Sequence, residues 1–190
     1  MLFDDNRNPV VFSLGSDMGD RKGNLERACK MLEQEIYYSA LFEQQLARYV
    51  PFDMGIHVDR PPVLKSGIYE YPAWPAGSGL PDFLNMALVL LSDKAPEDLL
   101  VIAKDIEQKL GRDMEPPVYD GEGNRIYRPR PIDIDIVFYG GLVYHGDNLD
   151  IPHPLCRQRR FVLEPIAEIV PEYIDPVSGK TVKELLEEIL

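Results

Sequence analysis

Residues 128–139 read RPRPIDIDIVFY, and this stretch decides how the rest of the chain is interpreted. From position 132 onward, apolar side chains recur at every second residue, which predicts a β-strand with one apolar face. Asp133 and Asp135 therefore share the opposite face, roughly 7 Å apart. Aspartate is depleted in strands, so two of them in one short strand indicate a special requirement. The apolar face consists of Ile132, Ile134, Ile136 and Phe138.

The paired carboxylates have two interpretations. Like charges this close repel each other unless a cation or a proton lies between them. Mg²⁺ binds such oxygen ligands and keeps coordination positions for water and substrate phosphates. The alternative is an edge strand with a solvated acidic face, because edge strands carry charges that prevent unwanted pairing. The strand by itself leaves both interpretations open.

Two arginines before the strand favour the metal site. Arg128 and Arg130 alternate with Pro129 and Pro131, which hold the backbone extended and turn successive side chains outward. These guanidinium groups could form salt bridges with the aspartates, but arginine also binds phosphate oxygens in a bidentate manner. Arginines beside a carboxylate pair indicate a polyphosphate site.

Composition limits the class of protein. The 190 residues fit one domain, residues 1–190, and suffice for a buried core. A formal net charge of −12 disfavours a nucleic acid or an anionic membrane as partner. Cys29 and Cys156 have neither metal-ligand nor redox spacing, which suits a reducing compartment. Because we find neither a secretory signal nor a membrane span, we expect a cytoplasmic protein.

The order of predicted elements indicates the fold class. Strand, helix, strand, strand, helix, strand is the ferredoxin-like βαββαβ arrangement of an α+β protein, with helices on one face of an antiparallel sheet. The glycines of residues 13–24 fit no phosphate-binding motif and predict a strand-to-helix turn. A C-terminal extension follows, with an apolar turn at 166–170 and a helix from Thr181. Strands are expected at 10–14, 63–71, 83–91 and 132–138, and helices at 25–36 and 95–110.

Two side chains are candidates for contact with a ring. Asn85 interrupts an apolar strand, and its amide must hydrogen-bond either backbone or the edge of a heteroaromatic ligand. Trp74 lies in a loop rich in Pro and Gly, where it is either a core anchor or a lid over a flat ligand.

A second basic cluster follows the Asp strand. His153 lies between two prolines, and three arginines come soon after it. Such a cluster is often a solvated surface. In an acidic chain with another arginine group beside a carboxylate pair, anion recognition is the more economical explanation. The three arginines are Arg157, Arg159 and Arg160.

Six segments match, in order, the motifs of one family. They are SLGSDMGDR at 13–21, FLN at 83–85, IEQKLGR at 106–112, RPRPIDIDI at 128–136, IPHP at 151–154 and RQRRFVLEPIAEIVPE at 157–172. With these segments the chain resembles 6-hydroxymethyl-7,8-dihydropterin pyrophosphokinase of folate biosynthesis. The combination of RP-x-IDIDI with a later IPHP is the most specific part of the match.

The resemblance implies Mg²⁺-dependent transfer of a pyrophosphoryl group from ATP to the hydroxymethyl group of the pterin, with release of AMP. It implies that Asp133 and Asp135 hold the Mg²⁺, with two ions expected. Arg130 and Arg159 would act in catalysis on the ATP phosphates. The implied ATP contacts are Glu107, Arg112, Arg130, His153 and Arg159. The implied pterin contacts are Tyr71, Trp74, Phe83, Asn85, Tyr127 and Phe161.

Some positions depart from the family pattern. Tyr127 stands where Trp is common, Tyr71 replaces a usual Thr, and Asp17 replaces a usual Asn. Residues 37–65 have no clear counterpart. We expect loops 74–81 and 112–127 to close over bound substrates, because each combines Pro and Gly hinges with aromatic or arginine side chains.

Two further hypotheses fit the aspartate pair. A metal-dependent nucleotidyl transferase also presents paired aspartates on a sheet, although the acidic balance and the pair Phe83 and Asn85 disfavour it. A ferredoxin-like ligand-binding module without catalysis is the other.

Overall fold

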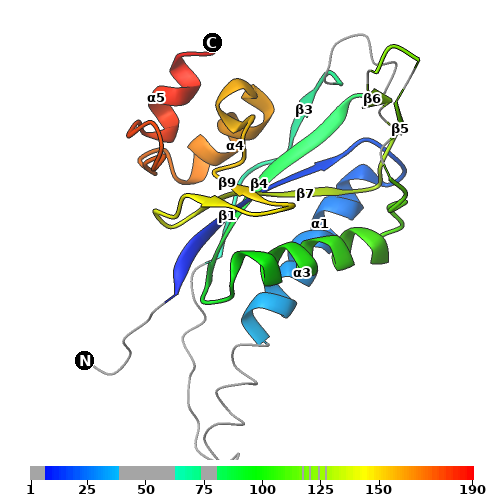
Figure 1. Cartoon of the computed structure of the whole chain (residues 1–190), viewed down its shortest axis with the longest axis horizontal. Coiled ribbons are helices and arrows are strands. Elements are labelled where there is room, and N and C mark those ends of the chain that lie inside the picture. The colour runs from blue at the N-terminus through cyan, green and yellow to red at the C-terminus, as the bar shows by residue number, and fades with distance from the viewer. Residues whose placement is uncertain are drawn as a thin grey trace, which may run out of the picture.

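An antiparallel sheet runs through the middle of the molecule (Figure 1). The computed structural model describes residues 7–38, 63–73, 81–116, 118–119, 121–123, 125–126 and 128–190. The strands of this sheet are β1 (Asn8–Ser16), β2 (Leu64–Lys65), β3 (Tyr69–Tyr71), β4 (Phe83–Ser92) and β7 (Asp133–Tyr139). Their order is β2-β4-β1-β7, and β3 also pairs with β4. This order places β1 between the strand that carries Asn85 and the strand that carries the aspartates.

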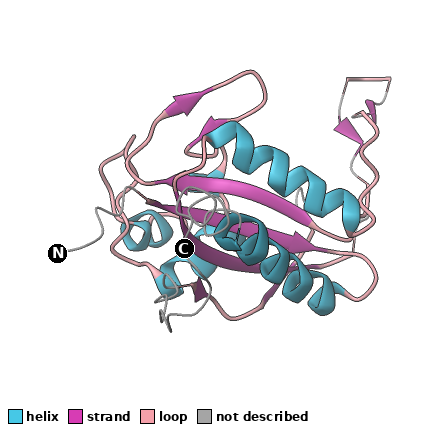
Figure 2. Cartoon of the chain, turned by 90° about the horizontal axis from the view of Figure 1, so that it is seen from below, coloured by secondary structure: helices cyan, strands magenta, loops and turns pink. Residues whose placement is uncertain are grey.

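Helices cover both faces of the sheet. Helices α1 (Arg21–Glu33) and α3 (Pro96–Lys109) lie on one face, as Figure 2 shows from their side. Helices α4 (Arg160–Ile169) and α5 (Val182–Glu187) lie on the other face (Figure 1). The two helices of the βαββαβ order thus share one face, as expected, and the C-terminal extension covers the other face. Val11 and Ala87 are fully buried on that second face and require such a cover. The turn expected at 166–170 is wrong, because these residues include the end of α4.

The apolar alternation of the Asp strand changes sides near its end. The register of β1 against β7 shifts between Val11 and Phe12. Before the shift, Ile136 packs in the cluster beneath α1 and α3, whereas Phe138 packs beneath α4 and α5. The prediction that both share one face is wrong, because an irregularity in the ladder adds a residue and reverses the pattern.

The strand expected at 63–71 is split into β2 and β3. Between them, the Ser66 hydroxyl accepts a hydrogen bond from the Ala87 N–H at 2.8 Å. The Ser66 N–H donates to the Ala87 carbonyl at 3.1 Å. The next N–H, that of Gly67, donates to the Glu168 carboxylate at 2.8 Å instead of to a strand. Side-chain groups thus replace part of the backbone ladder at this point.

The first strand is longer than expected. It continues to Ser16, so Gly15 lies inside the sheet and not in the turn. The turn itself uses Gly19, whose φ of 67° suits glycine. Helix α1 then begins after Asp20, whose carboxylate accepts from the Gly23 N–H at 3.0 Å.

Short elements complete the described fold. Strands β5 (Val118–Tyr119) and β6 (Arg125–Ile126) form a hairpin where only a loop was expected. The others are η1 (Gln34–Tyr38), β8 (Tyr144–His145), β9 (Asp150–Ile151) and η2 (Cys156–Gln158). Among the described residues, no helix is long and apolar enough to span a bilayer.

A buried ion pair fixes the connection between α4 and α5. Asp175 is fully buried and accepts from Arg157 Nε at 2.6 Å, from Arg157 at a second nitrogen at 2.8 Å and from the Ser178 hydroxyl at 2.5 Å. Burial alone would raise the Asp175 pKa, but these hydrogen bonds outweigh it and lower the pKa to about 2. A carboxyl whose pKa is lowered by folding adds stability above its unfolded pKa of about 3.9, and loses it as the pH falls towards 2.

We therefore expect Asp175→Asn to lower the free energy of unfolding by about 2–4 kcal/mol at pH 6. The difference from the unsubstituted chain should shrink by about 2 kcal/mol between pH 5 and pH 2.5, because the native carboxylate then loses its advantage. Urea denaturation at several pH values measures both quantities. Asp147→Asn, at an exposed carboxylate, is the control. A difference that stays constant with pH would contradict the linkage.

Candidate functional site

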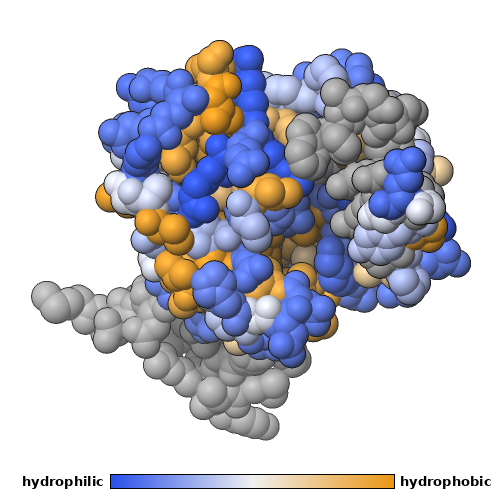
Figure 3. Space-filling model, turned by 45° about the horizontal axis from the view of Figure 1, so that its top comes forward, coloured by the Kyte–Doolittle hydropathy of each residue, from blue (hydrophilic) through white to orange (hydrophobic). Residues whose placement is uncertain are grey.

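A pocket opens where β1, β4 and β7 present polar side chains. Its volume is 380 Å³, which suits a small-molecule site. Hydrophilic and hydrophobic side chains also lie side by side on the molecular surface (Figure 3). The ionisable lining residues are Lys104, Arg112, Arg130, Asp133, Asp135, His153, Arg159 and Tyr71. The other lining residues are Ser13, Gly15, Pro72, Phe83, Asn85, Leu155 and Phe161.

Small residues of β1 form the floor of the pocket. Gly15 pairs with Asn85 on one side and with Asp133 on the other. A Cβ at Gly15 would lie 3.1 Å from the Asn85 side-chain oxygen and 3.4 Å from the Phe83 ring. Glycine thus leaves the space between the amide and the carboxylate open. Ser13 lies opposite Asp135 in the same ladder.

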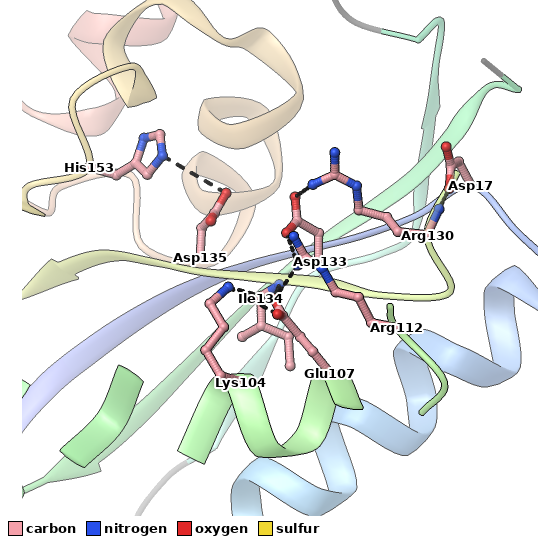
Figure 4. Close-up of polar contacts among 9 residues, drawn as sticks. All are labelled: Asp17, Lys104, Glu107, Arg112, Arg130, Asp133, Ile134, Asp135 and His153. Atoms are coloured by element: carbon pink, nitrogen blue, oxygen red, sulfur yellow. Dashed lines mark hydrogen bonds and ion pairs between the residues drawn. The ribbon is translucent and has the colours of Figure 1, made fainter. Parts of the chain in front are cut away.

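Asp133 accepts from two arginines. Arg130 donates to its Oδ2 at 2.8 Å, and Arg112 donates to its Oδ1 (Figure 4). Burial alone would raise the Asp133 pKa, but the guanidinium groups of Arg130 and Arg112 outweigh it and hold the pKa below its usual value. Asp133 is therefore an anion that faces the pocket with two cations beside it.

Asp135 is in a different electrostatic state. It lies beside His153, with the histidine Nε2 4.0 Å from Asp135 Oδ2 (Figure 4). Burial and, second, the charge of Asp133 raise the Asp135 pKa, and His153 offsets only part of this effect. The pKa of His153 is itself lowered, chiefly by burial and then by Arg159. The second carboxylate thus lacks a compensating charge as strong as that beside Asp133.

This donor set fits Mg²⁺. Asp133 and Asp135 supply oxygen ligands from one rigid strand. The pKa of Asp135 is raised first by burial and second by the charge of Asp133, and a cation would offset both effects. Among the described residues there is no group of three or more His, Cys, Asp or Glu placed to hold a metal. An ion here would need further ligands from water or substrate, which is how Mg²⁺ binds in nucleotide sites.

Glu107 lies behind the pocket and holds its charged wall in place. It is fully buried on α3, and its carboxylate accepts from the Ile134 N–H at 2.8 Å. The same group pairs with Lys104 at 3.0 Å and with Arg112 at 2.7 Å. Burial raises the Glu107 pKa, and the two cations offset only part of the rise. Glu107 thus connects a helix, a strand and two cations that line the pocket.

Asp17 fixes the backbone of Arg130. The Arg130 N–H donates to Asp17 Oδ1 at 2.6 Å, and the Asp17 N–H donates to the Arg130 carbonyl at 3.3 Å. The Ser16 hydroxyl donates to the Pro131 carbonyl at 2.5 Å. The end of β1 therefore sets the position from which Arg130 enters the pocket.

The arginines after His153 divide into separate roles. Arg159 lines the pocket, with its guanidinium carbon 5.6 Å from the centre of the Phe161 ring. Arg157 belongs to the buried pair with Asp175, and Arg160 donates to Glu164. The interpretation of all three as one anion-binding group is therefore wrong for Arg157 and Arg160 within the described structure, since other carboxylates take them.

The chain matches one family of known proteins over most of its length. The family model for 7,8-dihydro-6-hydroxymethylpterin-pyrophosphokinase (HPPK) matches residues 11–171. The chain belongs to this family. A 2-amino-4-hydroxy-6-hydroxymethyldihydropteridine pyrophosphokinase of Methylorubrum extorquens is 37% identical over 181 residues, which cover 95% of this chain and 92% of that protein.

Other HPPK relatives are longer than this chain. The Synechocystis protein of the same name is 38% identical over 137 residues, covering 71% of this chain and 62% of that protein. The match to the folic acid synthesis protein FOL1 of Dictyostelium discoideum spans only 20% of that protein. A solved structure of Plasmodium falciparum HPPK-DHPS with pteroate has a TM-score of 0.62 at 14% identity, covering 99% of this chain and 43% of that one. This last likeness shows a shared fold.

Those HPPK-type residues predicted from sequence that the structure describes converge, with one exception. Ten of them lie in the wall of the pocket, whereas Glu107 is behind it. Trp74 and Tyr127 lie outside the described residues, as does most of loop 74–81. The individual roles of these residues stay predictions. The ten are Tyr71, Phe83, Asn85, Arg112, Arg130, Asp133, Asp135, His153, Arg159 and Phe161.

Sequence reasoning missed Lys104. It lines the pocket from α3 and pairs with Glu107, three residues later on the same helix face. The spacing of the two residues was the available signal, because positions three apart are neighbours on a helix. An acidic residue at a buried helical position, with a lysine one turn earlier, indicates a polar contact between the helix and the site.

Proposed function

We propose that the chain transfers the pyrophosphoryl group of ATP to the hydroxymethyl group of 6-hydroxymethyl-7,8-dihydropterin and releases AMP. One observation carries the proposal. A single pocket joins an aromatic and amide wall, suited to a flat heterocycle, to a carboxylate pair flanked by arginines, suited to a magnesium polyphosphate. The pyrophosphokinase activity for which the relatives from Methylorubrum and Synechocystis are named agrees with it.

In the proposed reaction, the substrate hydroxyl oxygen attacks the β-phosphorus of ATP. The bond from that phosphorus to the bridging oxygen of the α-phosphate breaks, AMP departs, and the hydroxyl proton passes to solvent. Asp133 and Asp135 would hold Mg²⁺, which neutralises phosphate charge and orients the oxygens when bound. Such transfer depends chiefly on positioning and charge, so no dedicated general base is invoked.

The remaining pocket residues divide between the two substrates. Arg130 and Arg159 would bind phosphate oxygens, and Lys104 and Arg112 add charge from the α3 side. Phe161 and its neighbouring rings would stack on the pterin, while the Asn85 amide reads its edge. Among the described residues, the Asn85 side chain has only a weak bond to the Phe83 carbonyl at 3.5 Å, so within this part of the chain the amide is available.

The test is an assay with ATP, Mg²⁺ and the hydroxymethyl-dihydropterin that follows AMP and the pterin product. We expect AMP to form only when all three are present, with the product mass increased by one pyrophosphoryl group. Omitting the pterin and chelating Mg²⁺ are the controls. A nucleoside monophosphate in the product would instead support a nucleotidyl transferase, and ATP binding without AMP would support a non-catalytic module.

We also infer the finer features of the fold and setting. The strand order β2-β4-β1-β7 and the crossovers through α1 and α3 support a ferredoxin-like core within one domain, extended by α4 and α5. A cytoplasmic location stays a prediction from composition. Closure of loops 74–81 and 112–127 also stays a prediction. Equal protease sensitivity of both loops with and without an ATP analogue plus pterin would contradict it.

A further inference from the structure

Helix α4 carries two carboxylates one turn apart that both bind groups at β3. Glu168 accepts from the Tyr69 hydroxyl at 2.9 Å and from the Gly67 N–H at 2.8 Å. Glu164 accepts from the Tyr71 hydroxyl. In the described sheet, β3 has three residues and pairs with β4 alone, so these contacts tie a short strand to the helix above it.

The contact of Glu164 with Tyr71 and that of Glu168 with Tyr69 differ in their position relative to the pocket. Tyr71 lines the pocket, whereas Tyr69 does not. The Tyr71 ring centre lies 6.3 Å from that of Phe161, and the two rings are tilted by 57°. Tyr71 therefore adds an aromatic face to the end of the pocket that also contains Phe161, while Glu168 and Tyr69 make the same kind of contact outside it.

Glu164 is itself fixed on its other side. Arg160, four residues earlier on α4, donates to it twice, at 2.8 Å and 3.1 Å. The hydrogen bonds from Arg160 and then Tyr71 lower the Glu164 pKa, so it stays a carboxylate at neutral pH. The Tyr71 pKa is raised, first by burial and then by Glu164, so the phenol keeps the proton that it donates. Arg160 and Tyr71 are thus both donors to the Glu164 carboxylate, and each of these hydrogen bonds pairs a donor with an acceptor.

We propose that Glu164 is a positioning residue that fixes Tyr71 as a wall for the flat ring of the pterin. The inference rests on the proposed function, and it concerns the substrate ring and not the phosphates. Because the Tyr71 hydroxyl is taken by Glu164, Tyr71 contributes its ring face and not a hydrogen bond to substrate. Without Glu164, the Tyr71 ring adopts other side-chain rotamers, and in these it does not contact the pterin.

The test compares Glu164→Ala with Glu168→Ala, the matched control on the same helix. We expect Glu164→Ala to raise the KM for the pterin about 5–10-fold, the effect of one well-placed hydrogen bond, and to leave the KM for ATP within about twofold. Glu164→Gln keeps an acceptor for Tyr71 and should recover most of the loss. Glu168→Ala should leave both KM values within about twofold, even where it lowers the melting temperature equally.

Tyr71→Phe completes the test. It removes the hydroxyl but keeps the ring, so it should weaken pterin binding about as much as Glu164→Ala. The double variant should be no weaker than either single one, because both remove the same contact. Direct titration of the pterin, followed by its fluorescence, provides a readout independent of turnover.

Three outcomes would overturn the inference. They are equal rises in the KM for pterin and ATP, equal effects of Glu164→Ala and Glu168→Ala, and additive effects in the double variant. Each of these results would mean that the contact between Glu164 and Tyr71 does not specifically position the ring for the pterin. An unsubstituted chain that neither binds the pterin nor forms AMP would instead contradict the proposed function, so the two failures are distinguishable.

Discussion

An Asp135→Asn variant is expected to form AMP at least about 100-fold more slowly than the unsubstituted chain. Asp135 is one of two carboxylates on the pocket face of β7, with 33% of its side chain exposed. Its removal halves the negative charge that would hold Mg²⁺. Because arginines already compensate Asp133, the less compensated Asp135 should contribute more to metal binding than its neighbour.

The measurement is the rate of AMP formation over a range of Mg²⁺ concentrations. A lost ligand should raise the Mg²⁺ concentration needed for half-maximal rate as well as lower the maximal rate. Asp93→Asn is the control, since this exposed residue follows the far end of β4 from Asn85. Circular dichroism should be unchanged in both variants. An Asp135→Asn enzyme with more than a third of the normal rate and an unchanged Mg²⁺ requirement would contradict the assignment.

Asp133→Asn should differ from Asp135→Asn in its effect on ATP binding. Arg112 and Arg130 then lose the carboxylate that accepts from both of them. Arg112 keeps its ion pair with Glu107, but the positive charge facing the pocket is compensated less, so ATP should bind more tightly in the absence of Mg²⁺ even though turnover falls. Titration of ATP in the presence of a chelator separates this effect from catalysis.

The centre of the site was predictable because its residues lie on one short strand. A period of two places Asp133 and Asp135 on one face whatever the rest of the chain does, and the apolar isoleucines fix which face is buried. The prolines beside Arg130 add a local constraint of the same kind. Local geometry of this type is contained in neighbouring residues, so the sequence alone specifies it.

Other features depend on partners that are distant in sequence. Arg157 and Arg159 look alike in the sequence, yet one pairs with Asp175 and the other lines the pocket. The reversal at Phe138 follows from the register against β1, and β1 lies more than a hundred residues earlier. Glu164 looks like an ordinary helix residue until the sheet brings Tyr71 to it. These outcomes are set by tertiary contacts, which local pattern does not contain.

Glu107 carries the second large prediction, because it supports an edge of the sheet. In the described sheet β7 is the last strand in the order β2-β4-β1-β7, so backbone N–H groups on its outer side have no ladder partner among the described strands. Glu107 accepts one of them, that of Ile134, from a position with no solvent exposure. The Glu107 carboxylate thus supplies the hydrogen-bond acceptor that a neighbouring strand would otherwise provide, next to the two aspartates.

Glu107→Ala is expected to lower the free energy of unfolding by about 3–5 kcal/mol, measured by urea denaturation. The loss arises from the groups left behind: a buried Ile134 N–H without its acceptor and Lys104 without its ion-pair partner. The pKa of Glu107 is raised because burial costs the carboxylate more than its cations return, so the expected loss comes from the groups left unpaired and not from a favourable charge on Glu107 itself. Gln108→Ala, at the exposed neighbouring position, should change stability by less than about 0.5 kcal/mol.

Glu107→Gln separates the role in stability from the role in the site. Glutamine still accepts from the Ile134 N–H, so the variant should keep more than half of the stability lost in Glu107→Ala. It removes the charge that holds Lys104 and Arg112 in the pocket wall, so the KM for ATP should rise several-fold while that for the pterin is little changed. If both KM values rise together in a fully folded Glu107→Gln enzyme, Glu107 supports the whole pocket and not its phosphate side. If neither rises, the two cations hold their positions without it.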